Sequence, residues 1–510
     1  MKNLKRILCF SMILLMLCGA FVGCKKDESP DSTESSDVVS ESDLPAETDE
    51  YGQQVIGDKV PYEELDYNNA DILIATRTND RYKREFGVTN RTDVVDEKVY
   101  LRNQKVQEDL GVKLKLVPVS DLDYNDSITK NMSNYVLTAH QSGDPLDIVA
   151  SMAAYAVLPG IRDCYVDLMG DEATYLNIDK PYWNQSYIDA ASMYGQLYYI
   201  VGDINLTVYD RAMVTYVNEN LLPSTMTGDQ LKKLVLDGGW TFEVMDQLAS
   251  QFGYNDKDNI NGITEGDEFG IVSTYGSEAY DGFMPGFDLY GLLEENDDGS
   301  WSYNISGNQK LQSGLELIQG LWDSTYAYAW DQEPVFKAFI EQRALFNVEI
   351  IWRDAAQNKQ LSNVGFKYSI LPMPKYDAEE QDGYYTSPQD AYTSMSIMNH
   401  KPERVEMVSA VLDLLCSRSY SDVRPFYIEK IVKTRYVNNA IEVQIMDQIL
   451  NGIVYETAII YGNQLGMPAY AAWRFRVMEG GTISTMWASN GQTFEAKLED
   501  VTDWYYARAT

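Results

Sequence analysis

Apolar and polar positions along the chain alternate in a way that predicts strands and helices in turn. Residues 70–77 (ADILIATR) form a short apolar, β-branched run, and residues 112–119 (VKLKLVPV) alternate as a strand does. Between them, residues 97–111 carry apolar side chains at helical spacing and end at Gly111, a common stop after a helix. Together these segments predict a β-α-β unit.

The alternation continues to the end of the chain. Residues 239–253 predict a helix that has Thr241 as its N-cap and Gly253 just past its end. Apolar runs predict further strands, and amphipathic spacing predicts further helices. The strands are 144–151, 343–352 and 366–374, and the helices are 403–417 and 440–453. This order favours an α/β class with parallel sheets, in which ligands sit at the carboxyl ends of strands.

The first residues have the pattern of an export signal. Three cations within residues 1–6 precede the apolar run 7–23, which ends in small residues. A transmembrane anchor is the alternative, since seventeen residues just reach the lower limit for spanning a bilayer. The sequence Phe21-Val22-Gly23-Cys24 resembles the lipobox of bacterial lipoproteins, with Phe in place of the usual Leu. This resemblance implies that residues 1–23 are a signal peptide and that Cys24 is lipidated.

A long acidic stretch follows the cysteine. Residues 25–55 consist largely of Ser, Asp and Glu, so they cannot bury enough surface to offset the entropy lost on ordering. We therefore expect a disordered tether over residues 24–57. The remaining body of about 450 residues exceeds what one hydrophobic core usually supports, which predicts two lobes.

Composition and charge narrow the function. The chain has 41 Lys and Arg against 77 Asp and Glu, a net charge of −36, so its surface repels nucleic acid and anionic lipid headgroups. Apart from the signal and Cys24, only Cys164 and Cys416 remain, which are too few for a disulfide framework and predict buried small apolar residues. His140 and His400 lie far apart and lack the spacing of zinc ligands.

Six stretches, in this order, resemble those of a known family. The segments are MYGQLYYIVGD (193–203), TYVNENLL (215–222), GGWTFEVMDQLA (238–249), EQRALFNVEIIW (341–352), YSILPMPKYD (368–377) and NHKPERVEMVSAVLDLLCS (399–417). They are similar to segments of the extracellular solute-binding proteins of bacterial ABC importers, family 1 or the maltodextrin-binding-like group. The chain departs from that pattern by lacking Pro after Ile200 and by having Leu345 where Met is common.

The resemblance implies a two-lobed α/β periplasmic-binding-protein fold of type II, with a hinged cleft between the lobes. It assigns residues 58–200 and 341–400 to the first lobe and residues 201–340 and 401–510 to the second. It further implies a monomeric binding protein without enzymatic activity or cofactor. Such a protein captures a solute, in our reading a carbohydrate or oligosaccharide, and delivers it to permease subunits while anchored by lipid on the outer face of the cytoplasmic membrane.

Candidate ligand contacts follow from positions in the family pattern and from the 37 Tyr and 9 Trp, whose rings suit the apolar faces of sugars. The candidates are Arg77, Asn79, Asp80, Met152, Tyr155, Asp203, Asn205, Glu349 and Trp352. Local clustering of Tyr, Trp and Asp adds Tyr280, Asp281, Trp330 and Tyr392.

Two other functions have some support in the sequence. Residues 255–268 are rich in oxygen ligands, but a calcium loop with Gly262 at its sixth position would have Lys257 at the first, where Asp is needed. That register favours a solvated loop. An exported, lipid-anchored glycoside hydrolase would need two carboxylates about 5–5.5 or 6.5–9.5 Å apart, which sequence spacing cannot test. A structural or adhesive lipoprotein is the third alternative.

Overall fold

In this computed structural model, residues 47–88, 91, 93–119, 129–274, 277–330, 332–351, 360–433 and 439–509 are described, and the residues from Thr48 onward form one compact unit. The side chains of residues 129–131, 277–281, 330, 332 and 431 lie outside the description. Within the described residues, the helices are all too short or too polar to cross a membrane.

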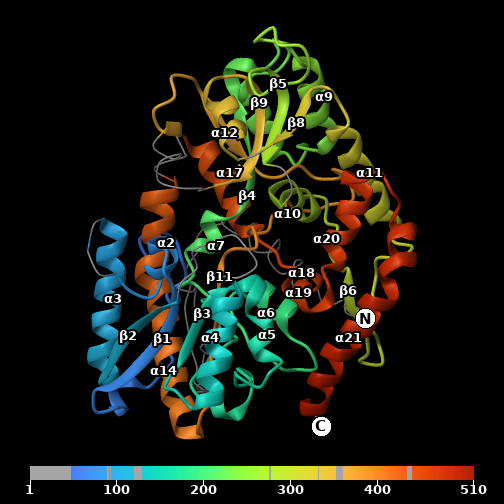
Figure 1. Ribbon diagram of the computed structural model, residues 1–510. Helices are drawn as coiled ribbons and strands as arrows, with labels where there is room; N and C mark the ends of the chain where they lie inside the picture. Colours follow the sequence, from blue (N-terminus) through green and yellow to red (C-terminus); the bar gives the residue numbers. More distant parts are fainter. Residues whose placement is uncertain are drawn as a thin grey trace, which may run out of the picture. The chain divides into compact units, whose positions relative to one another are not determined.

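The described strands form two larger sheets and a hairpin (Figure 1). The first sheet has the order β11 (Thr393–Ile397), β3 (Ile148–Met152), β1 (Ala70–Arg77), β2 (Val112–Val119). The second has the order β10 (Tyr368–Leu371), β4 (Met213–Asn218), β9 (Ala344–Ile350), β5 (Phe269–Thr274), β8 (Ala327–Trp330). The hairpin pairs β6 (Leu293–Glu295) with β7 (Trp301–Tyr303).

Helices connect these strands. Before β9 they are α2 (Asp80–Lys83), α3 (Val94–Leu110), α4 (Thr129–Ser142), α5 (Val157–Gly160), α6 (Gln185–Ala191), α7 (Thr207–Asp210), α8 (Gly228–Leu236), α9 (Phe242–Phe252), α10 (Ser277–Gly286), α11 (Gln309–Trp322) and α12 (Gln332–Ile340). After β11 they are α14 (Pro402–Arg418), α15 (Arg424–Phe426), α17 (Ala440–Asn451), α18 (Thr457–Ile460), α19 (Gly462–Leu465), α20 (Pro468–Trp473) and α21 (Ile483–Ala509).

Shorter turns complete the path of the chain. Single 3₁₀ turns are η2 (Tyr62–Glu64), η3 (Ala153–Tyr155), η4 (Asp171–Ala173) and η5 (Glu219–Leu221), and π-helical segments are η6 (Ser419–Val423), η7 (Tyr427–Lys433) and η8 (Arg474–Met478).

The predicted β-α-β unit is confirmed. Strand β1 pairs in parallel with β2 and β3, whereas β11 returns antiparallel to β3. The Asp93 side chain caps α3 by accepting from the N–H groups of Val95 and Asp96, and Gly111 closes the helix in the left-handed conformation, at φ 60°. The sheets are thus mixed, with a parallel centre in the first.

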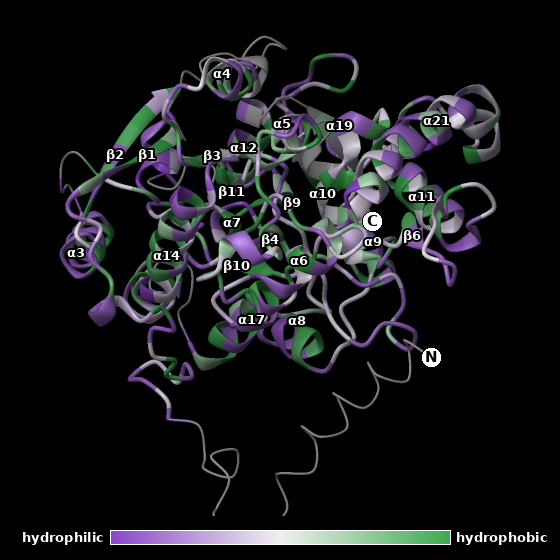
Figure 2. Ribbon diagram, turned by 90° about the horizontal axis from the view of Figure 1, so that it is seen from below, coloured by the Kyte–Doolittle hydropathy of each residue, from purple (hydrophilic) through white to green (hydrophobic). Residues whose placement is uncertain are grey.

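The helix predicted between residues 239 and 253 also forms as expected. The Thr241 hydroxyl accepts from the N–H of Val244 at the start of α9, and Gly253 follows its last residue with φ 79°. Every residue of the central strands β4 and β9 is buried, while the outer helix α3 carries many hydrophilic residues (Figure 2). The two remaining cysteines, Cys164 and Cys416, are free and buried, as predicted.

Strand pairing corrects the expected lobe boundaries. Strand β9 pairs with β4 and β5, and β10 pairs with β4, so both belong to the second sheet although residues 341–400 were assigned to the first lobe. Helix α14 packs on α3 and β11 of the first sheet, although residues 401–510 were assigned to the second lobe. The physical reason is that partners of a strand are chosen by long-range pairing, which the local pattern does not encode.

The end of the expected tether is part of the folded body. Gln53 donates to the carbonyl of Tyr420 at 2.7 Å and accepts from the Arg424 guanidinium at 2.7 Å. The Tyr420 hydroxyl in turn donates to the carbonyl of Gln54 at 2.9 Å. The predicted boundary at residue 57 is therefore too late, while residues 1–46 lie outside the described part of the chain.

Two stretches that run between the sheets lie side by side. The first, residues 200–213, leads into β4, and the second, residues 386–393, leads from the second sheet back to β11. The N–H of Gln389 donates to the carbonyl of Arg211 at 3.0 Å, and the N–H of Met213 donates to the carbonyl of Ser387 at 3.3 Å. We call this pair the crossing segments, because both connect the first sheet to the second.

Candidate functional site

The carboxyl end of β1 places one of the predicted contacts against the crossing segments. Arg77 donates through Nη1 to the carbonyl of Ala391 at 2.7 Å, and its guanidinium carbon lies 3.4 Å from the centre of the Tyr82 ring. Asn79 caps α2 by accepting from the N–H of Arg81 at 3.0 Å. Asp80 has a side chain that is 92% exposed and pairs with the next turn of its own helix. Of these three predicted residues, Arg77 is the one that reaches the crossing segments.

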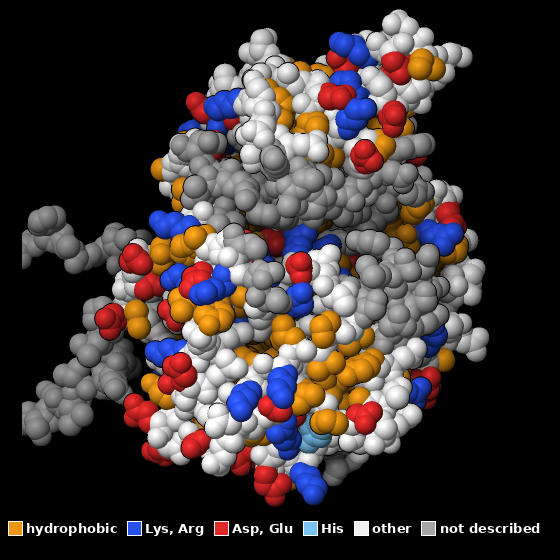
Figure 3. All heavy atoms as spheres, turned by 60° about the vertical axis from the view of Figure 1, so that its left-hand side comes forward, with side chains coloured by type: hydrophobic (Ala, Val, Ile, Leu, Met, Phe, Trp, Pro, Cys, Tyr) orange, Lys and Arg blue, Asp and Glu red, His pale blue; other side chains and the backbone are white. Residues whose placement is uncertain are grey.

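A second arginine from the crossing segments meets the same tyrosine. Arg211 donates to the Tyr82 hydroxyl and to the side-chain oxygen of Gln389, and its guanidinium carbon lies 5.5 Å from the Tyr82 ring centre. Arg81 forms an ion pair with Asp210 at 3.1 Å. We call Arg77, Arg81 and Arg211 the arginine cluster. In Figure 3, where the side carrying α2 and α3 comes forward, Lys and Arg side chains are interspersed with Asp and Glu over the face.

A small cavity borders the second crossing segment. Its volume is about 30 Å³, enough for about one water molecule. Tyr392 and Tyr455 supply aromatic walls, and Glu456 adds a carboxylate. The remaining lining residues are Ala153, Ala154, Tyr290, Ser387, Pro388, Asp390, Ile459 and Ile460. The predicted contacts Met152 and Tyr155 flank this lining, at the end of β3 and in η3.

Three tyrosine rings pack edge to face beside this cavity. The ring centres of Tyr187 and Tyr455 are 5.1 Å apart, those of Tyr392 and Tyr455 are 5.5 Å apart, and those of Tyr187 and Tyr392 are 6.3 Å apart. The Tyr455 hydroxyl is buried without a hydrogen-bond partner among the described residues. Such rings offer both an apolar face and a polar group.

Glu456 is buried beside these rings and is fully occupied by the backbone. Its carboxylate accepts from the N–H groups of Gly291 at 2.6 Å, Leu292 at 3.1 Å and Ala458 at 3.2 Å. Burial outweighs these hydrogen bonds and raises its pKa to about 7. Since it also caps α18, Glu456 fixes the wall of the cavity.

The predicted contacts Asp203 and Asn205 are held inside the first crossing segment. One Asp203 oxygen accepts from the Tyr209 hydroxyl at 2.8 Å and pairs with Arg424 at 3.2 Å. Asn205 is completely buried and accepts from the N–H of Gly202 at 3.0 Å. Burial raises the pKa of Asp203, and the Arg424 charge opposes that shift. Their role as solute contacts stays a prediction.

Glu349 lies on β9 of the second sheet and contacts the neighbouring strand β5. The side chain accepts from its own following N–H, that of Ile350, at 2.8 Å and from the Thr274 hydroxyl on β5 at 3.2 Å. Trp352 lies outside the described residues, and so do the side chains of Tyr280, Asp281 and Trp330.

The structure therefore brings the predicted residues together in part. Tyr392 lines the cavity, Met152 and Tyr155 adjoin its lining residues Ala153 and Ala154 in sequence, and Arg77 lies at the arginine cluster. Sequence reasoning missed Tyr82, Arg211, Tyr455 and Glu456, which come from separate segments. The only local signal for them is adjacent Tyr and Glu at positions 455 and 456.

A larger cavity, of about 360 Å³, lies away from the crossing segments. Its lining combines the stretch 163–172 with Tyr198, Asn399, Trp504 and Arg508, and Arg508 covers the Trp504 ring at 4.0 Å. None of these lining residues belongs to the crossing segments, whereas the smaller cavity is lined by four residues of the second one. A solute held between the two sheets would not occupy it.

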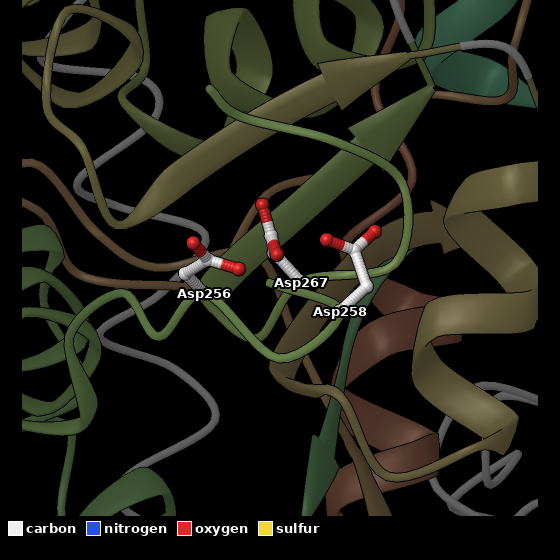
Figure 4. A group of neighbouring side chains, drawn as sticks. All are labelled: Asp256, Asp258 and Asp267. Atoms are coloured by element: carbon white, nitrogen blue, oxygen red, sulfur yellow. The ribbon is translucent and has the colours of Figure 1, made fainter. Parts of the chain in front are cut away.

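The oxygen-rich loop gathers Asp256, Asp258 and Asp267, as Figure 4 shows, with one carboxylate oxygen of each within 4.8 Å of the others. The two Asp267 oxygens accept from the Tyr254 hydroxyl at 2.9 Å and from the N–H groups of Thr264 at 2.9 Å and Lys257 at 3.1 Å. Calcium takes six to eight oxygen ligands. Because the loop's own donors already occupy Asp267, these bonds explain the shape of the loop without an ion.

The comparisons with known proteins agree on the fold. No protein-family model and no curated protein matches the chain in sequence. Among solved structures, a cyclo/maltodextrin-binding protein complexed with maltotetraose is 13% identical, with a TM-score of 0.53 over 84% of this chain and 98% of that one. An ABC transporter solute-binding protein from Thermotoga lettingae TMO, bound with alpha-D-tagatose, is 11% identical, with a TM-score of 0.51 over 84% and 100%.

The chain thus has the two-lobed fold of maltodextrin-binding and other solute-binding proteins of ABC transporters, as the sequence resemblance predicted. At these identities the likeness concerns the fold, and the solute must be argued from the residues of this chain.

Proposed function

We propose that this protein is the substrate-binding component of an ABC importer and captures an extracellular carbohydrate between its two lobes. The observation that carries the proposal is the position of the tyrosine-walled cavity. Its lining joins η3, next to the first sheet, to the second crossing segment and to α18. A binding site at the junction of two α/β lobes is the usual arrangement where a hinge closes around a ligand.

A carbohydrate suits the lining of this junction. Tyr392 and Tyr455 present aromatic surface, and the Tyr455 hydroxyl has no partner among the described residues. Sugars combine apolar C–H faces with hydroxyl rims, so they pair with such rings and donors together. The two neighbours in fold were crystallised with maltotetraose and with alpha-D-tagatose, both carbohydrates.

Solute entry requires the crossing segments to act as a hinge. A cavity of about 30 Å³ holds no sugar ring, so the two sheets must separate before a solute enters. A hinge needs only a few residues in connecting segments to absorb the backbone change. We assign that role to residues 200–213 and 386–393, and we assign recognition of the closed form to permease subunits.

A ligand screen tests the proposal. Thermal unfolding of the purified chain should be measured with monosaccharides, maltooligosaccharides and short peptides. A saccharide at 100 times its Kd should stabilise the native state by about 2.7 kcal/mol, and it should be recovered unchanged. Recovery of shortened oligosaccharides would instead establish the glycoside hydrolase, and stabilisation by peptides alone would overturn the carbohydrate assignment.

The aromatic contact predicted from sequence is part of this proposal. Replacing Trp352 by Ala should weaken sugar binding by about 2 kcal/mol or more if the ring anchors the solute. The measurement is calorimetric titration beside a melting curve. A lower melting temperature with intact affinity would show that Trp352 is a core residue and not a solute contact.

Localisation is proposed from the first 24 residues. We propose that the protein is held by lipid on Cys24 at the outer face of the cytoplasmic membrane. The Cys24→Ser chain should be released from the membrane or keep its signal. If it were cleaved after Gly23 and stayed membrane-bound like the parent, the lipid anchor would be ruled out.

A further inference from the structure

A buried arginine at the crossing segments lacks the partners that buried arginines normally have. Arg211 is 6% exposed, and its Nε atom has no hydrogen-bond partner among the described residues. Its other two nitrogens donate to neutral groups, the Gln389 amide oxygen and the Tyr82 hydroxyl. No carboxylate of the described chain lies within ion-pair distance of it. Burying a charge without a counter-ion is costly.

The other two buried arginines of the described chain each have a kind of partner that Arg211 lacks. Arg418, 3% exposed, pairs with Asp58 at 3.0 Å and with Asp109 at 2.6 Å. Arg102, also 3% exposed, gives hydrogen bonds through all three of its nitrogens. Arg418 also has one nitrogen, Nη1, without a hydrogen-bond partner, but its charge is paired. Arg211 alone among these three therefore combines an unused donor with the lack of a counter-charge in the described residues. Its burial is therefore not explained by the internal contacts that hold the others.

Two further arginines act on the Arg211 charge. Burial lowers the pKa of its guanidinium; Tyr82 opposes this shift, and the charges of Arg81 and Arg77 add to it. The nearest acid in sequence, Asp210, is already engaged, since one oxygen pairs with Arg81 at 3.1 Å and the other accepts from the Tyr427 hydroxyl. Two guanidinium groups, those of Arg77 and Arg211, thus contact Tyr82, and that of Arg81 lies one ion pair away on Asp210, in a protein of net charge −36.

The position of this cluster also fits a ligand. Arg77 is the last residue of β1, and ligands of α/β sheets bind at the carboxyl ends of the strands. Arg211 and Gln389 belong to the crossing segments, where solute entry opens the junction between the sheets. An anion arriving there would give Arg211 the counter-charge and the acceptor that its Nε lacks. A planar guanidinium binds carboxylate and sulfate groups through two parallel hydrogen bonds.

We propose that the solute is an anionic oligosaccharide, whose carboxylate or sulfate is bound by Arg211 together with Arg77 and Arg81 beside Tyr82. This inference rests on the proposed function and specifies its substrate class. The sugar rings would lie against the tyrosines of the cavity, while the anion fixes the orientation of the chain at the arginine cluster.

Calorimetry with ligands that differ only in charge tests the inference. Trigalacturonate should bind the purified chain at least tenfold more tightly than its fully methyl-esterified form, which has the same length and no charge. A singly sulfated maltotriose, compared with maltotriose, distinguishes a sulfate from a carboxylate as the group recognised. Tighter binding of either charged member supports the proposal, and equal or weaker binding of both overturns it.

Variants then test whether the arginine cluster causes the preference for the charged ligand. Arg211→Gln should abolish the preference for the charged ligand, and Arg211→Lys, which keeps a charge but not the fork of donors, should retain part of it. Arg91→Gln is the matched control, because Arg91 is about half exposed, pairs with Glu97 and lies over the ring of Tyr100. If Arg211→Gln fails to fold, Arg77→Gln replaces it. An unchanged preference in the cluster variants would overturn the assignment.

The two proposals fail in different ways. If neutral and charged saccharides bind equally, the carbohydrate function stands and the anion inference falls. If no saccharide binds and acidic peptides do, the proposed function itself falls, and the substrate class falls with it.

Discussion

Arg102 and Arg211 are both buried, but the two regions around them differ in how many hydrogen-bond acceptors they provide for the guanidinium group. Arg102, on α3 in the first lobe, donates through Nη1 to the Ser419 hydroxyl at 2.8 Å, through Nη2 to the carbonyl of Glu85 at 2.7 Å, and through Nε to Asn103 at 3.0 Å. Arg211, on the crossing segment, has two neutral partners and one unused nitrogen. Neither has a carboxylate of the described chain within ion-pair distance.

From this difference we infer that Arg102 stabilises the fold and that Arg211 is available to bind a ligand. A buried guanidinium whose donors are all used joins elements that are distant in the chain, here α3, the segment after α2 and η6. A buried guanidinium with a spare donor and no counter-charge contributes little to the fold, because its desolvation is only partly offset by hydrogen bonds. The comparison therefore predicts that stability and solute binding depend on different arginines.

The largest effect on stability is expected when Arg102 is replaced. Replacing Arg102 by Met should lower the free energy of unfolding by about 3–4 kcal/mol, because the Glu85 carbonyl and the Asn103 amide oxygen lose a buried donor. Urea titration followed by tryptophan fluorescence measures it. Affinity for the solute, measured below the transition, should not change. A loss under about 1 kcal/mol would contradict a structural role for Arg102.

The pH dependence of stability should come in part from Glu85, which lies between the two regions. This side chain is fully buried, and one oxygen accepts from the N–H and the hydroxyl of Thr207, both at 2.7 Å. Burial raises its pKa to about 7, against 4.5 for an exposed glutamate, and the nearby charge of Asp210 adds to the rise. Between pH 4.5 and 7 the unfolded chain loses this proton while the folded chain keeps it. Stability therefore falls as the pH rises through that window.

Glu85→Gln should remove this fall. The difference in unfolding free energy between the variant and the parent should shift in favour of Gln by about 2–3 kcal/mol from pH 4.5 to pH 8, at about 1.4 kcal/mol per pKa unit. Glu499→Gln, on the exposed face of α21, is the control and should show no such shift. A pH-independent difference for Glu85→Gln would mean that Glu85 does not keep its proton in this window.

Much of the fold was predictable, because local patterns determine local elements. The strand predicted at 70–77 is β1 with the same ends, and the caps predicted at Thr241 and Gly253 form. The lobe to which the strand at 343–352 belongs was not predictable in this way. Its apolar pattern fits either sheet, and only pairing with β4 and β5, more than 70 residues away in sequence, decides.

The site was less predictable than the fold. Arg77 was expected at the junction from the end of β1, and it lies against the second crossing segment. Arg211 carried no signal, because a buried arginine with an unused donor looks the same in sequence as any other. The distinction between Arg102 and Arg211 exists only once partners from distant segments are known.

A smaller effect on stability is expected at Arg211 itself. Arg211→Met should change the unfolding free energy by less than about 1 kcal/mol, since replacing a poorly compensated buried charge by an apolar side chain is often neutral. The same urea titration as for Arg102→Met makes the two values directly comparable. A loss as large as that of Arg102→Met would show that both arginines are structural and would remove the contrast between the regions.

The smallest effect on stability is expected at Tyr455. Removing its hydroxyl tests whether this wall of the cavity binds the solute. Its oxygen is buried without a partner among the described residues, so Tyr455→Phe removes an unsatisfied polar atom and leaves the ring packing in place. The free energy of unfolding should change by no more than about 0.5 kcal/mol. If the hydroxyl binds the solute, affinity should fall about fivefold, close to 1 kcal/mol, in calorimetric titration.

Tyr187→Phe is the matched control, because Tyr187 packs on the same rings but does not line the cavity. The affinity of this control variant for the solute should equal that of the parent. If both variants bind the solute with the same affinity, the solute does not contact this wall, and the arginine cluster is left as the only supported contact.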